Sequence, residues 1–286
     1  MGKGTVTSWK YYNHAMIPNC APHEVPDMKP VEDGSVWRGG GYFARWTTDF
    51  DCGEETGFWY CIKDDVFDIQ SLKSKRRYEI VKGKRNFSCQ RIEAEKYSSE
   101  IADILAEAAG QYPDKYRQDV DREAVLQMIP EWDRRYLVYG AFDEKGRLCG
   151  YAYLERYDSY SEFRVLKVYP ACERKGINAA LTACILEDYR EVLEQGHYIC
   201  DGTRPIQHET NFQDYLAKYF GFRKAYCRLH IKYRWYVKAV IHMLYIFRKK
   251  IEKHSSHRLL YKITGVLKME EIVRNSDKEL QDNQGN

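Results

Sequence analysis

No two of the nine cysteines in this 286-residue chain are spaced as a CxxC pair. Structural zinc sites usually take their thiolates from such pairs, so the sequence predicts no structural zinc and gives no sign of another metal. Several of the cysteines lie in apolar or alternating runs, where a reduced thiol behaves as a small hydrophobe. We expect them to fill the core.

The chain also lacks a long apolar run. Its first residues, MGKGTVTSWKYYNHAM, hold no continuous apolar stretch and do not resemble a secretory signal. The most apolar run, YVKAVIHMLYIFRKKI from Tyr236, covers about four turns and contains Lys238, which is short of the ~20 residues that a membrane span needs. We therefore expect a cytoplasmic protein without a membrane-spanning helix.

Acidic residues are nearly missing from one part of the chain. Between Arg223 and Lys268 there are thirteen Lys and Arg and one acid, Glu252, although the whole chain carries a net charge of only +3. Such a segment favours an anionic partner. Two interpretations stay open: a helix lying peripherally on the inner face of an anionic membrane, or a helix packed on the domain with its basic end in water.

Composition and local pattern divide the chain into four parts. Apolar residues make 44% of it and charged residues 30%, which is typical of a globular protein. Residues 1–33 hold four of the eight prolines and little periodicity, which predicts an irregular arm. Residues 34–86 predict two strands and then a basic helix over 68–86. Residues 87–235 form the main domain, and residues 236–286 a basic helical segment with a polar tail.

In the main domain the apolar spacing changes regularly between periods of two and 3.6 residues. The predicted order is strand, helix, helix, three strands, helix, strand, helix, strand, without an obvious internal repeat. This order predicts an α/β (α+β) fold in which the three consecutive strands are antiparallel, with a strand and helix extension before the main domain and basic helices after it.

The run LKVYPACERKGINAAL, residues 166–181, combines a strand, a short loop and the start of a helix. The N–H groups of such a loop, with the positive end of the helix, can hold a pyrophosphate. The residues that this interpretation selects for cofactor binding are Val168, Arg174, Lys175, Gly176, Ile177 and Asn178.

This run resembles the phosphate-binding segment of the GNAT acyltransferase superfamily, whose members transfer an acyl group from coenzyme A to an amine or another acceptor. Val168 and Pro170 match the usual V-x-P, and Gly176 matches the second key position. Glu173 stands where the family usually has Gln or Arg, and Arg174 where it has the first Gly. The resemblance implies a GNAT-like fold over about half the chain, which is a mixed, mostly antiparallel sheet flanked by helices. It also implies acetyl-CoA or another acyl-CoA as donor.

A second segment, DGTRPIQHETNFQDYLAKYFGF from residue 201, is similar to the GNAT segment in which an Asn opens a helix that ends in Gly-Phe. Asn211 matches that Asn and joins the predicted cofactor site. Many family members carry a Tyr four residues before the Gly, where it can protonate the leaving thiolate. Ala217 occupies that position here, and Tyr215 is the flanking residue that we keep as a candidate acid.

The best candidates for general acid–base catalysis are Asp201, at the end of a predicted strand, and His208, in the loop after it. Glu162, at the end of a central strand, is the other carboxylate that could activate an amine. Each of these residues also has a purely structural interpretation, as a cap or a solvated carboxylate. Arg204 could bind an acidic acceptor or form a surface ion pair.

Two alternatives to a coenzyme A-dependent acyltransferase stay open. A basic helix of the form LKSKRRYEIVKGKRN before a GNAT-like domain resembles Fem-type aminoacyltransferases, in which aminoacyl-tRNA can be the donor. That resemblance is partial, because residues 34–86 are too few for a second full half. It implies tRNA as a partner. For either kind of transferase we expect a small molecule, a glycan or a peptide as acceptor. The other alternative is a binding protein that kept the fold and lost the chemistry.

Overall fold

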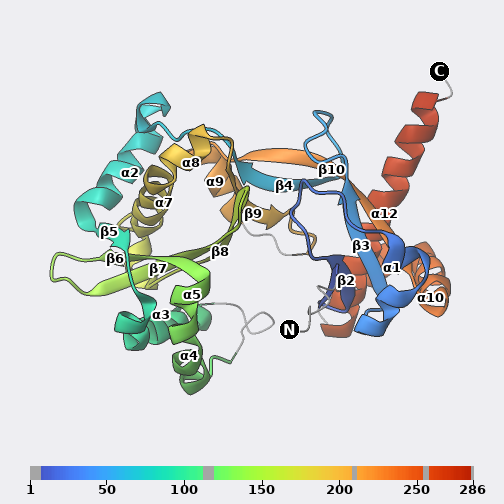
Figure 1. Cartoon of the computed structure of the whole chain (residues 1–286), viewed down its shortest axis with the longest axis horizontal. Coiled ribbons are helices and arrows are strands. Elements are labelled where there is room, and N and C mark those ends of the chain that lie inside the picture. Colours follow the sequence, from blue (N-terminus) through green and yellow to red (C-terminus); the bar gives the residue numbers. More distant parts are fainter. Residues whose placement is uncertain (1–7, 112–118, 208–210, 254–257, 285–286) are drawn as a thin grey trace, which may run out of the picture. The chain divides into compact units, whose positions relative to one another are not determined.

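The computed structural model describes residues 8–111, 119–207, 211–253 and 258–284 of the chain (Figure 1). These residues form two compact units. Unit 1 comprises Met1–Tyr60, Thr203–Thr210 and Lys224–Asn286, and unit 2 comprises Cys61–Gly202 and Asn211–Arg223. Unit 1 therefore draws on both ends of the chain, whereas unit 2 holds most of the predicted main domain.

Unit 2 contains five strands in the order β9-β8-β7-β6-β5. Their bounds are β5 Ser88–Arg91, β6 Tyr136–Phe142, β7 Leu148–Arg156, β8 Tyr160–Val168 and β9 Tyr198–Thr203. All neighbouring pairs are antiparallel except β8 and β9, which run parallel. The predicted fold class, a mixed and mostly antiparallel sheet flanked by helices, is confirmed.

Helices cover both faces of the unit 2 sheet, as Figure 1 shows. The longer ones are α2 Ser74–Asn86, α3 Ser98–Gly110, α4 Arg122–Met128, α7 Ile177–Asp188 and α9 Phe212–Phe220; the shorter ones are α5 Trp132–Arg135, α6 Pro170–Glu173 and α8 Arg190–Glu194. Alternate residues of β7 enter different cores. Ala152 and Leu154 pack with Ile177 of α7, whereas Tyr151 packs with Ile104 of α3. This alternation is the period-two pattern of a strand buried on both faces.

Two predicted helices of unit 2 have different bounds in the structure. The basic helix expected over residues 68–86 begins at Ser74, because Asp68 accepts a hydrogen bond from the N–H of Gln70 (2.8 Å) and caps a separate 3₁₀ turn, Ile69–Ser71. The single helix expected after the loop at Gly176 is divided at Tyr189 into α7 and α8.

Unit 1 contains β1 Trp9–Tyr12, β2 Ala15–Pro18, β3 Phe43–Thr48, all of β10 Arg223–Tyr233 but its first residue, and the first half of β4 Phe58–Lys63, in the order β1-β2-β3-β10-β4. The expectation of an irregular arm was wrong for residues 9–18, which form a hairpin. Asn13 and His14 link its strands and both have positive φ, 46° and 67°, as a two-residue hairpin turn requires. Trp9 and Met16 are buried and fix the register.

The helices of unit 1 are α1 Lys29–Glu32, α10 Trp235–Ile246, α11 Arg248–Lys253 and α12 Arg258–Gln284. The last of these continues into the polar tail and ends at Gln284. Its residue Met269 packs with Phe43, Phe58 and Leu229 of the strands, so α12 closes the apolar core of this unit.

Candidate active site

The central strands β8 and β9 separate after a short paired stretch. Parallel pairing joins Tyr160–Glu162 to Tyr198–Cys200, and the described part of β8 then continues to Val168 without a further partner on β9. On its other side β8 is irregular, because Arg164 has no opposite residue on β7. Such a bulge bends a strand and increases its local twist. Beyond Glu162, the edge of β8 that faces β9 is thus unpaired with β9.

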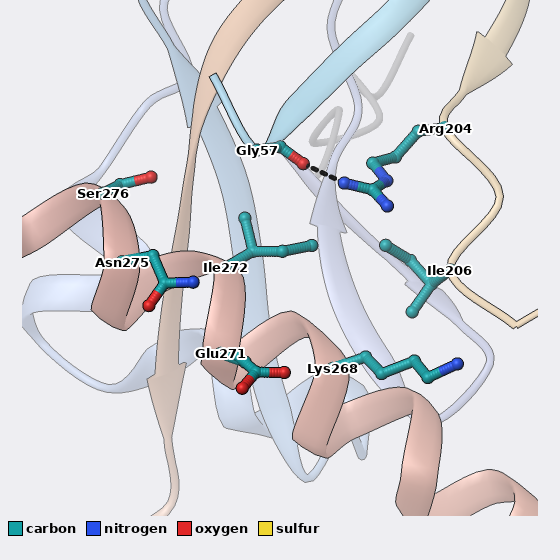
Figure 2. Close-up of a pocket in the computed structure, with 8 residues that line it drawn as sticks. All are labelled: Gly57, Arg204, Ile206, Lys268, Glu271, Ile272, Asn275 and Ser276. Atoms are coloured by element: carbon teal, nitrogen blue, oxygen red, sulfur yellow. Dashed lines mark hydrogen bonds between the residues drawn. The ribbon is translucent and has the colours of Figure 1, made fainter. Parts of the chain in front are cut away.

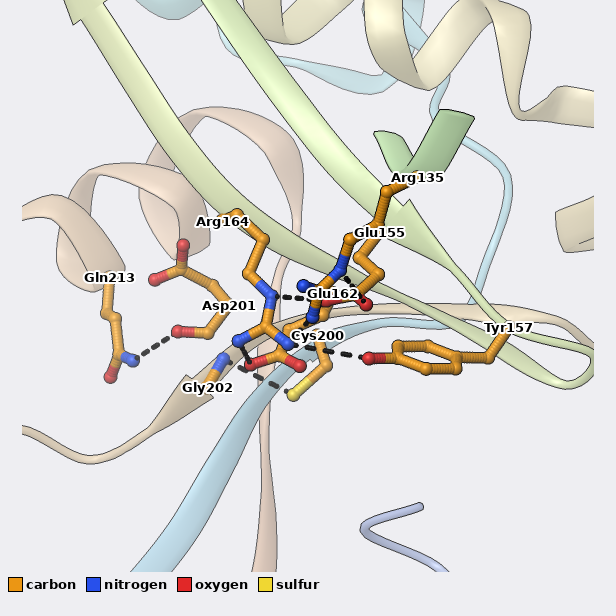
Figure 3. Close-up of polar contacts among 9 residues, drawn as sticks. All are labelled: Arg135, Glu155, Tyr157, Glu162, Arg164, Cys200, Asp201, Gly202 and Gln213. Carbon is orange, nitrogen blue, oxygen red and sulfur yellow. Dashed lines mark hydrogen bonds and ion pairs between the residues drawn. The ribbon is translucent and has the colours of Figure 1, made fainter. Parts of the chain in front are cut away.

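Four charged residues gather at this opening (Figure 3). Arg164 donates to Glu162 (Nη1 to Oε1, 2.7 Å) and to Glu155 (Nη2 to Oε2, 2.6 Å), while Arg135 donates to the other oxygen of Glu155 (2.8 Å). Glu155 is only 7% exposed. Burial alone would raise its pKa, but the hydrogen bonds from Arg135 and Arg164 hold the pKa below its ordinary value. Glu155 is thus an ionised structural carboxylate and an unsuitable base.

Asp201 lies within β9, next in sequence to the stretch that pairs with β8. Burial raises the pKa of its carboxyl to about 7; a hydrogen bond from Gln213 lowers it, and the charge of Glu162 raises it further. Gln213 also donates to the backbone carbonyl of Asp201 at 3.3 Å. A carboxyl with a pKa near neutrality can take up a proton and release it at physiological pH, which general acid–base catalysis requires.

The neighbouring Cys200 is not a nucleophile. Its side chain is 2% exposed, and its sulfur accepts a hydrogen bond from the N–H of Gly202 at 3.3 Å. Burial raises its pKa far above the ordinary value for a thiol, so the reactive thiolate is absent at neutral pH. The structure therefore places the cysteine in the role of core filling that the sequence predicted.

The other predicted acid–base residues lie in different surroundings. Glu162 lies in the charged group beside Asp201. Tyr215 instead packs among aromatic rings, 5.0 Å from Tyr219 and 6.1 Å from Phe212 between ring centroids, and burial raises its pKa. Within the described residues it makes no hydrogen bond to the charged group. His208 lies outside the described residues.

The predicted phosphate-binding turn is in close contact with α2. A Cβ on Gly83 of α2 would overlap the carbonyl oxygen of Gly176, and a Cβ on Gly176 would lie 3.0 Å from the Cα of Gly83. Gly176 also has a φ of +87°, which favours glycine. Backbone packing and conformation thus account for this glycine without a bound phosphate.

The polar groups around this turn are also engaged within unit 2. The N–H groups of Lys175 and Gly176 donate to the carbonyls of Cys172 and Glu173, each at 3.0 Å, and the carbonyl of Lys175 accepts from Asn86 Nδ2 at 2.9 Å. Two of the N–H groups predicted to hold a pyrophosphate are therefore used by the turn itself.

The remaining predicted cofactor residues lie in three environments. The side chains of Val168 and Ile177 are buried and point into the core, where Gly150 makes room for them. Arg174 and Asn211 are exposed, and Asn211 stands at the start of α9 without a side-chain cap hydrogen bond. Asn178 has a buried side-chain oxygen that lacks a hydrogen-bond partner among the described residues.

The residues described by the structure contain no group of three or more His, Cys, Asp or Glu that could hold a metal ion. None of the described helices combines the length and apolar character that crossing a membrane demands.

No family model matches the chain, and no curated protein matches it. Solved structures similar to it include L-PGS from Bacillus licheniformis, with 11% identity, a TM-score of 0.45, and coverage of 85% of this chain and 71% of that one. Another is the C-terminal domain (DUF2156) of a protein described as a lysylphosphatidylglycerol synthetase from Agrobacterium fabrum, with 14% identity, a TM-score of 0.48 and 82% coverage of both chains.

A third is the PaiA N-acetyltransferase from Thermoplasma acidophilum in complex with coenzyme A. It has 20% identity and a TM-score of 0.29, and the match covers 38% of this chain and 73% of that one. Similarity at this level assigns no activity, ligand or residue role to the present chain.

The sequence interpretation missed Arg164 as a member of the site. A signal was present, because Arg164 follows Glu162 by two residues on a predicted strand, so both side chains belong to one face. Gln213 was missed as well. It lies in the first turn of α9, and only the folded chain shows that this turn meets the end of β9.

Proposed function

We propose that the chain is an acyltransferase in which Asp201 is the general base. The observation that carries this proposal is a carboxyl with a pKa of about 7 on β9, beside the opening between β8 and β9. A base with this pKa is half deprotonated near pH 7 and still accepts a proton readily. Glu162 and Arg164 set the charge around it.

The proposed reaction is direct transfer. As the nitrogen or oxygen of an acceptor forms a bond to the acyl carbonyl carbon, Asp201 takes the acceptor's proton. The tetrahedral intermediate then collapses, the bond from the carbonyl carbon to the carrier breaks, and the carrier leaves with the electron pair and is protonated. Backbone N–H groups on the open edge of β8 beyond Glu162, up to Val168, are suited to stabilise the developing oxyanion. His208 stays a prediction as an additional acid or base.

Acyl-CoA is the donor in the first form of this proposal. A specific observation favours aminoacyl-tRNA as the second candidate: the Gly176 turn is packed against α2, and two of its N–H groups are engaged. A polynucleotide donor depends on a broad basic surface rather than on one phosphate cradle. α2 presents such a surface, with exposed Lys75, Lys84 and Arg85.

Turnover assays on the whole chain test the proposal. Acetyl-CoA and a mixture of aminoacyl-tRNAs are offered as donors with panels of amine, peptide and glycan acceptors, and carrier release is measured. With the donor that is used, Asp201→Asn should lower kcat by about 10²- to 10⁴-fold, because it removes the base. His208→Ala measures the contribution of the predicted histidine.

Asp214→Asn is the matched control, because Asp214 is an exposed carboxylate in the first turn of α9. It should leave kcat unchanged. Full activity in Asp201→Asn would refute the assignment of the base. Binding of a donor without turnover by the wild type would instead support a binding protein that lacks the chemistry.

A further inference from the structure

Unit 1 contains a cavity of about 400 Å³ between α12 and the segment that follows β9 (Figure 2). Arg204 lies on one side of it, and Lys268 and Glu271 of α12 lie on the other, with Asn275 and Ser276 completing the polar part of the wall. A volume of this size is within the range of small-molecule sites, about 300–1,000 Å³.

The guanidinium of Arg204 is held in place from several directions. Its Nη1 donates to the carbonyl of Gly57 at 2.5 Å, and the backbone N–H of Arg204 donates to the carbonyl of Trp59 at 2.9 Å. The guanidinium carbon lies 4.5 Å from the centroid of the Trp59 ring. The side chain is thus preorganised, and a ligand would not have to order it.

One edge of this guanidinium lacks a partner. Nε is buried and makes no hydrogen bond with any described residue, and the hydrogen bond to Gly57 uses Nη1 and leaves Nη2 for a ligand. Nε and Nη2 form the edge that holds a carboxylate or phosphate through two parallel hydrogen bonds. A buried donor without a partner is unfavourable, so an oxyanion at this edge would stabilise the arrangement.

The other charges of the cavity wall are already paired. Lys268 Nζ lies 3.1 Å from Glu252, and Glu271 lies 3.1 Å from Arg248. For Arg204, in contrast, no described carboxylate forms an ion pair, and burial lowers its pKa without an opposing charge. Among the charged residues of this wall, Arg204 is the one whose charge no described carboxylate balances.

We propose that this cavity binds a small organic anion. The carboxylate or phosphate of the ligand would accept hydrogen bonds from Nε and Nη2 of Arg204, and polar groups of its remainder would contact Asn275 and Ser276. The proposal does not depend on acyl transfer, because it uses residues of unit 1 alone.

Calorimetric titration of the whole chain with inorganic phosphate, acetate and glycerol tests this site. Phosphate or acetate should bind, the stronger of the two identifying the class of anion, and uncharged glycerol should not. Arg204→Met should weaken binding about tenfold or more, because two charge-assisted hydrogen bonds are lost. Arg38→Met, at an exposed arginine of the same unit, should leave it unchanged.

Asn275→Trp provides a second variant if Arg204→Met fails to fold, since Asn275 is exposed and a large side chain there would fill the mouth of the cavity. It should also abolish binding. The proposal is overturned if neither anion binds the wild type, or if Arg204→Met or Asn275→Trp binds as tightly as the wild type does.

A different observation concerns α10, whose solvent-facing side is apolar. Trp235 is 83% exposed, Ile246 75% and Met243 58%, and Tyr236, Val240 and the adjoining Phe247 are exposed too. At 3.6 residues per turn these six residues fall within a sector of about 140°. Ile241, the buried residue of the helix, lies outside this sector.

Basic residues accompany this apolar sector. Lys238 on α10 and Lys249 and Lys250 on α11 are exposed, and α10 contains no acid. An exposed apolar face bordered by lysines, with Trp and Tyr at one end, matches the chemistry of an anionic bilayer surface, where aromatic rings lie at the headgroups and lysines meet the lipid charges. From this charge complementarity we infer that α10 lies in the surface of an anionic membrane.

Sedimentation with vesicles tests this second inference. The whole chain should bind vesicles of equal parts phosphatidylcholine and phosphatidylglycerol, and bind pure phosphatidylcholine more weakly. The double variant Trp235→Ser with Ile246→Ser should lower partitioning by about tenfold or more, because two large apolar side chains are lost from the surface. Lys238→Gln should lower it about fivefold on the anionic vesicles only.

Val25→Ser is the control, because Val25 is 89% exposed in the same unit but lies far from α10 in sequence. It should leave partitioning unchanged. Equal binding by the wild type and the double variant overturns the inference. So does a dimer in gel filtration that the double variant abolishes while neither protein binds vesicles, since a second copy of the chain would then cover the face.

Discussion

Gly83 in α2 and Gly176 before α7 lie in backbone contact, so that neither position has room for a Cβ. α7 is the central helix of the unit 2 core, with Ile177, Leu181 and Ile185 buried completely or nearly so. The contact therefore lets α2 approach α7 closely enough for Ile80 to enter the same core. A glycine inside a helix is intrinsically unfavourable, and here the close approach offsets that cost.

We expect Gly83→Ala to destabilise the protein by about 1–3 kcal/mol, because the added methyl forces the two backbones apart. Helix propensity alone predicts the opposite sign, a gain of about 1 kcal/mol. Gly110→Ala is the matched control, since Gly110 ends α3 and a Cβ there meets no atom within 4 Å. Urea unfolding measures both, and a gain in stability for Gly83→Ala would contradict the packing argument.

Much of unit 2 follows from local sequence pattern, because the order of strands and helices depends on periodicity. The strands β6 and β7 and the helix α7 lie within the runs that predicted them, β9 and α9 end one residue beyond theirs, and β8 begins three residues before its run. The contact of Gly83 with Gly176 could not be predicted, since it joins residues 93 positions apart whose approach depends on the assembled core. Because this contact could not be predicted, the sequence suggested only a phosphate site at Gly176. The structure shows that Gly176 also packs against α2.

The candidate base was predictable in part. Asp201 was selected for its place at a strand end, but its neighbours decide its chemistry, and those come from β8 and α9. The bulge at Arg164 leaves no mark on the alternation of β8, so the local pattern could not predict where β8 and β9 separate.

The pH dependence of activity should report Asp201. Because its pKa is raised to about 7, the carboxylate that we propose as the general base forms as the pH rises through 7. We expect kcat/KM to increase tenfold per pH unit below pH 7 and to level off above it. Steady-state rates from pH 5 to pH 9 measure this. Asp201→Asn should retain only a low rate without that step, and an identical step in the variant would assign the titration to another group.

The same pKa makes a prediction about stability that needs no substrate. The folded-state pKa of about 7 exceeds the value of about 3.9 in an unfolded chain, so the native state binds more protons between these values. The contribution of Asp201 to stability should therefore be greatest below pH 4 and fall as the pH rises to 7. Asp201→Asn removes this contribution, and its free energy of unfolding should exceed that of the wild type at pH 8 but not at pH 4. Denaturant unfolding of both proteins at pH 4 and pH 8 measures this difference.

The two arginines on Glu155 should differ in importance, because they differ in exposure. The side chain of Arg164 is 30% exposed and bridges Glu155 to Glu162, whereas that of Arg135 is 61% exposed. Arg164→Met leaves a buried carboxylate with one partner, and we expect a loss of about 3 kcal/mol. Arg135→Met removes a mostly solvated contact and should cost at most about 1 kcal/mol.

A third variant separates charge from packing at this group. Adding Glu155→Gln to Arg164→Met removes the uncompensated charge, so the double variant should recover at least half of the loss. It should also leave the pKa of Asp201 raised, because burial is the main cause of that shift and Glu155 is not among its causes. Urea unfolding gives the coupling energy, and the pH profile of kcat/KM gives the pKa. If the profile moved below pH 6 in the double variant, the charged group and not burial would set the basicity of Asp201.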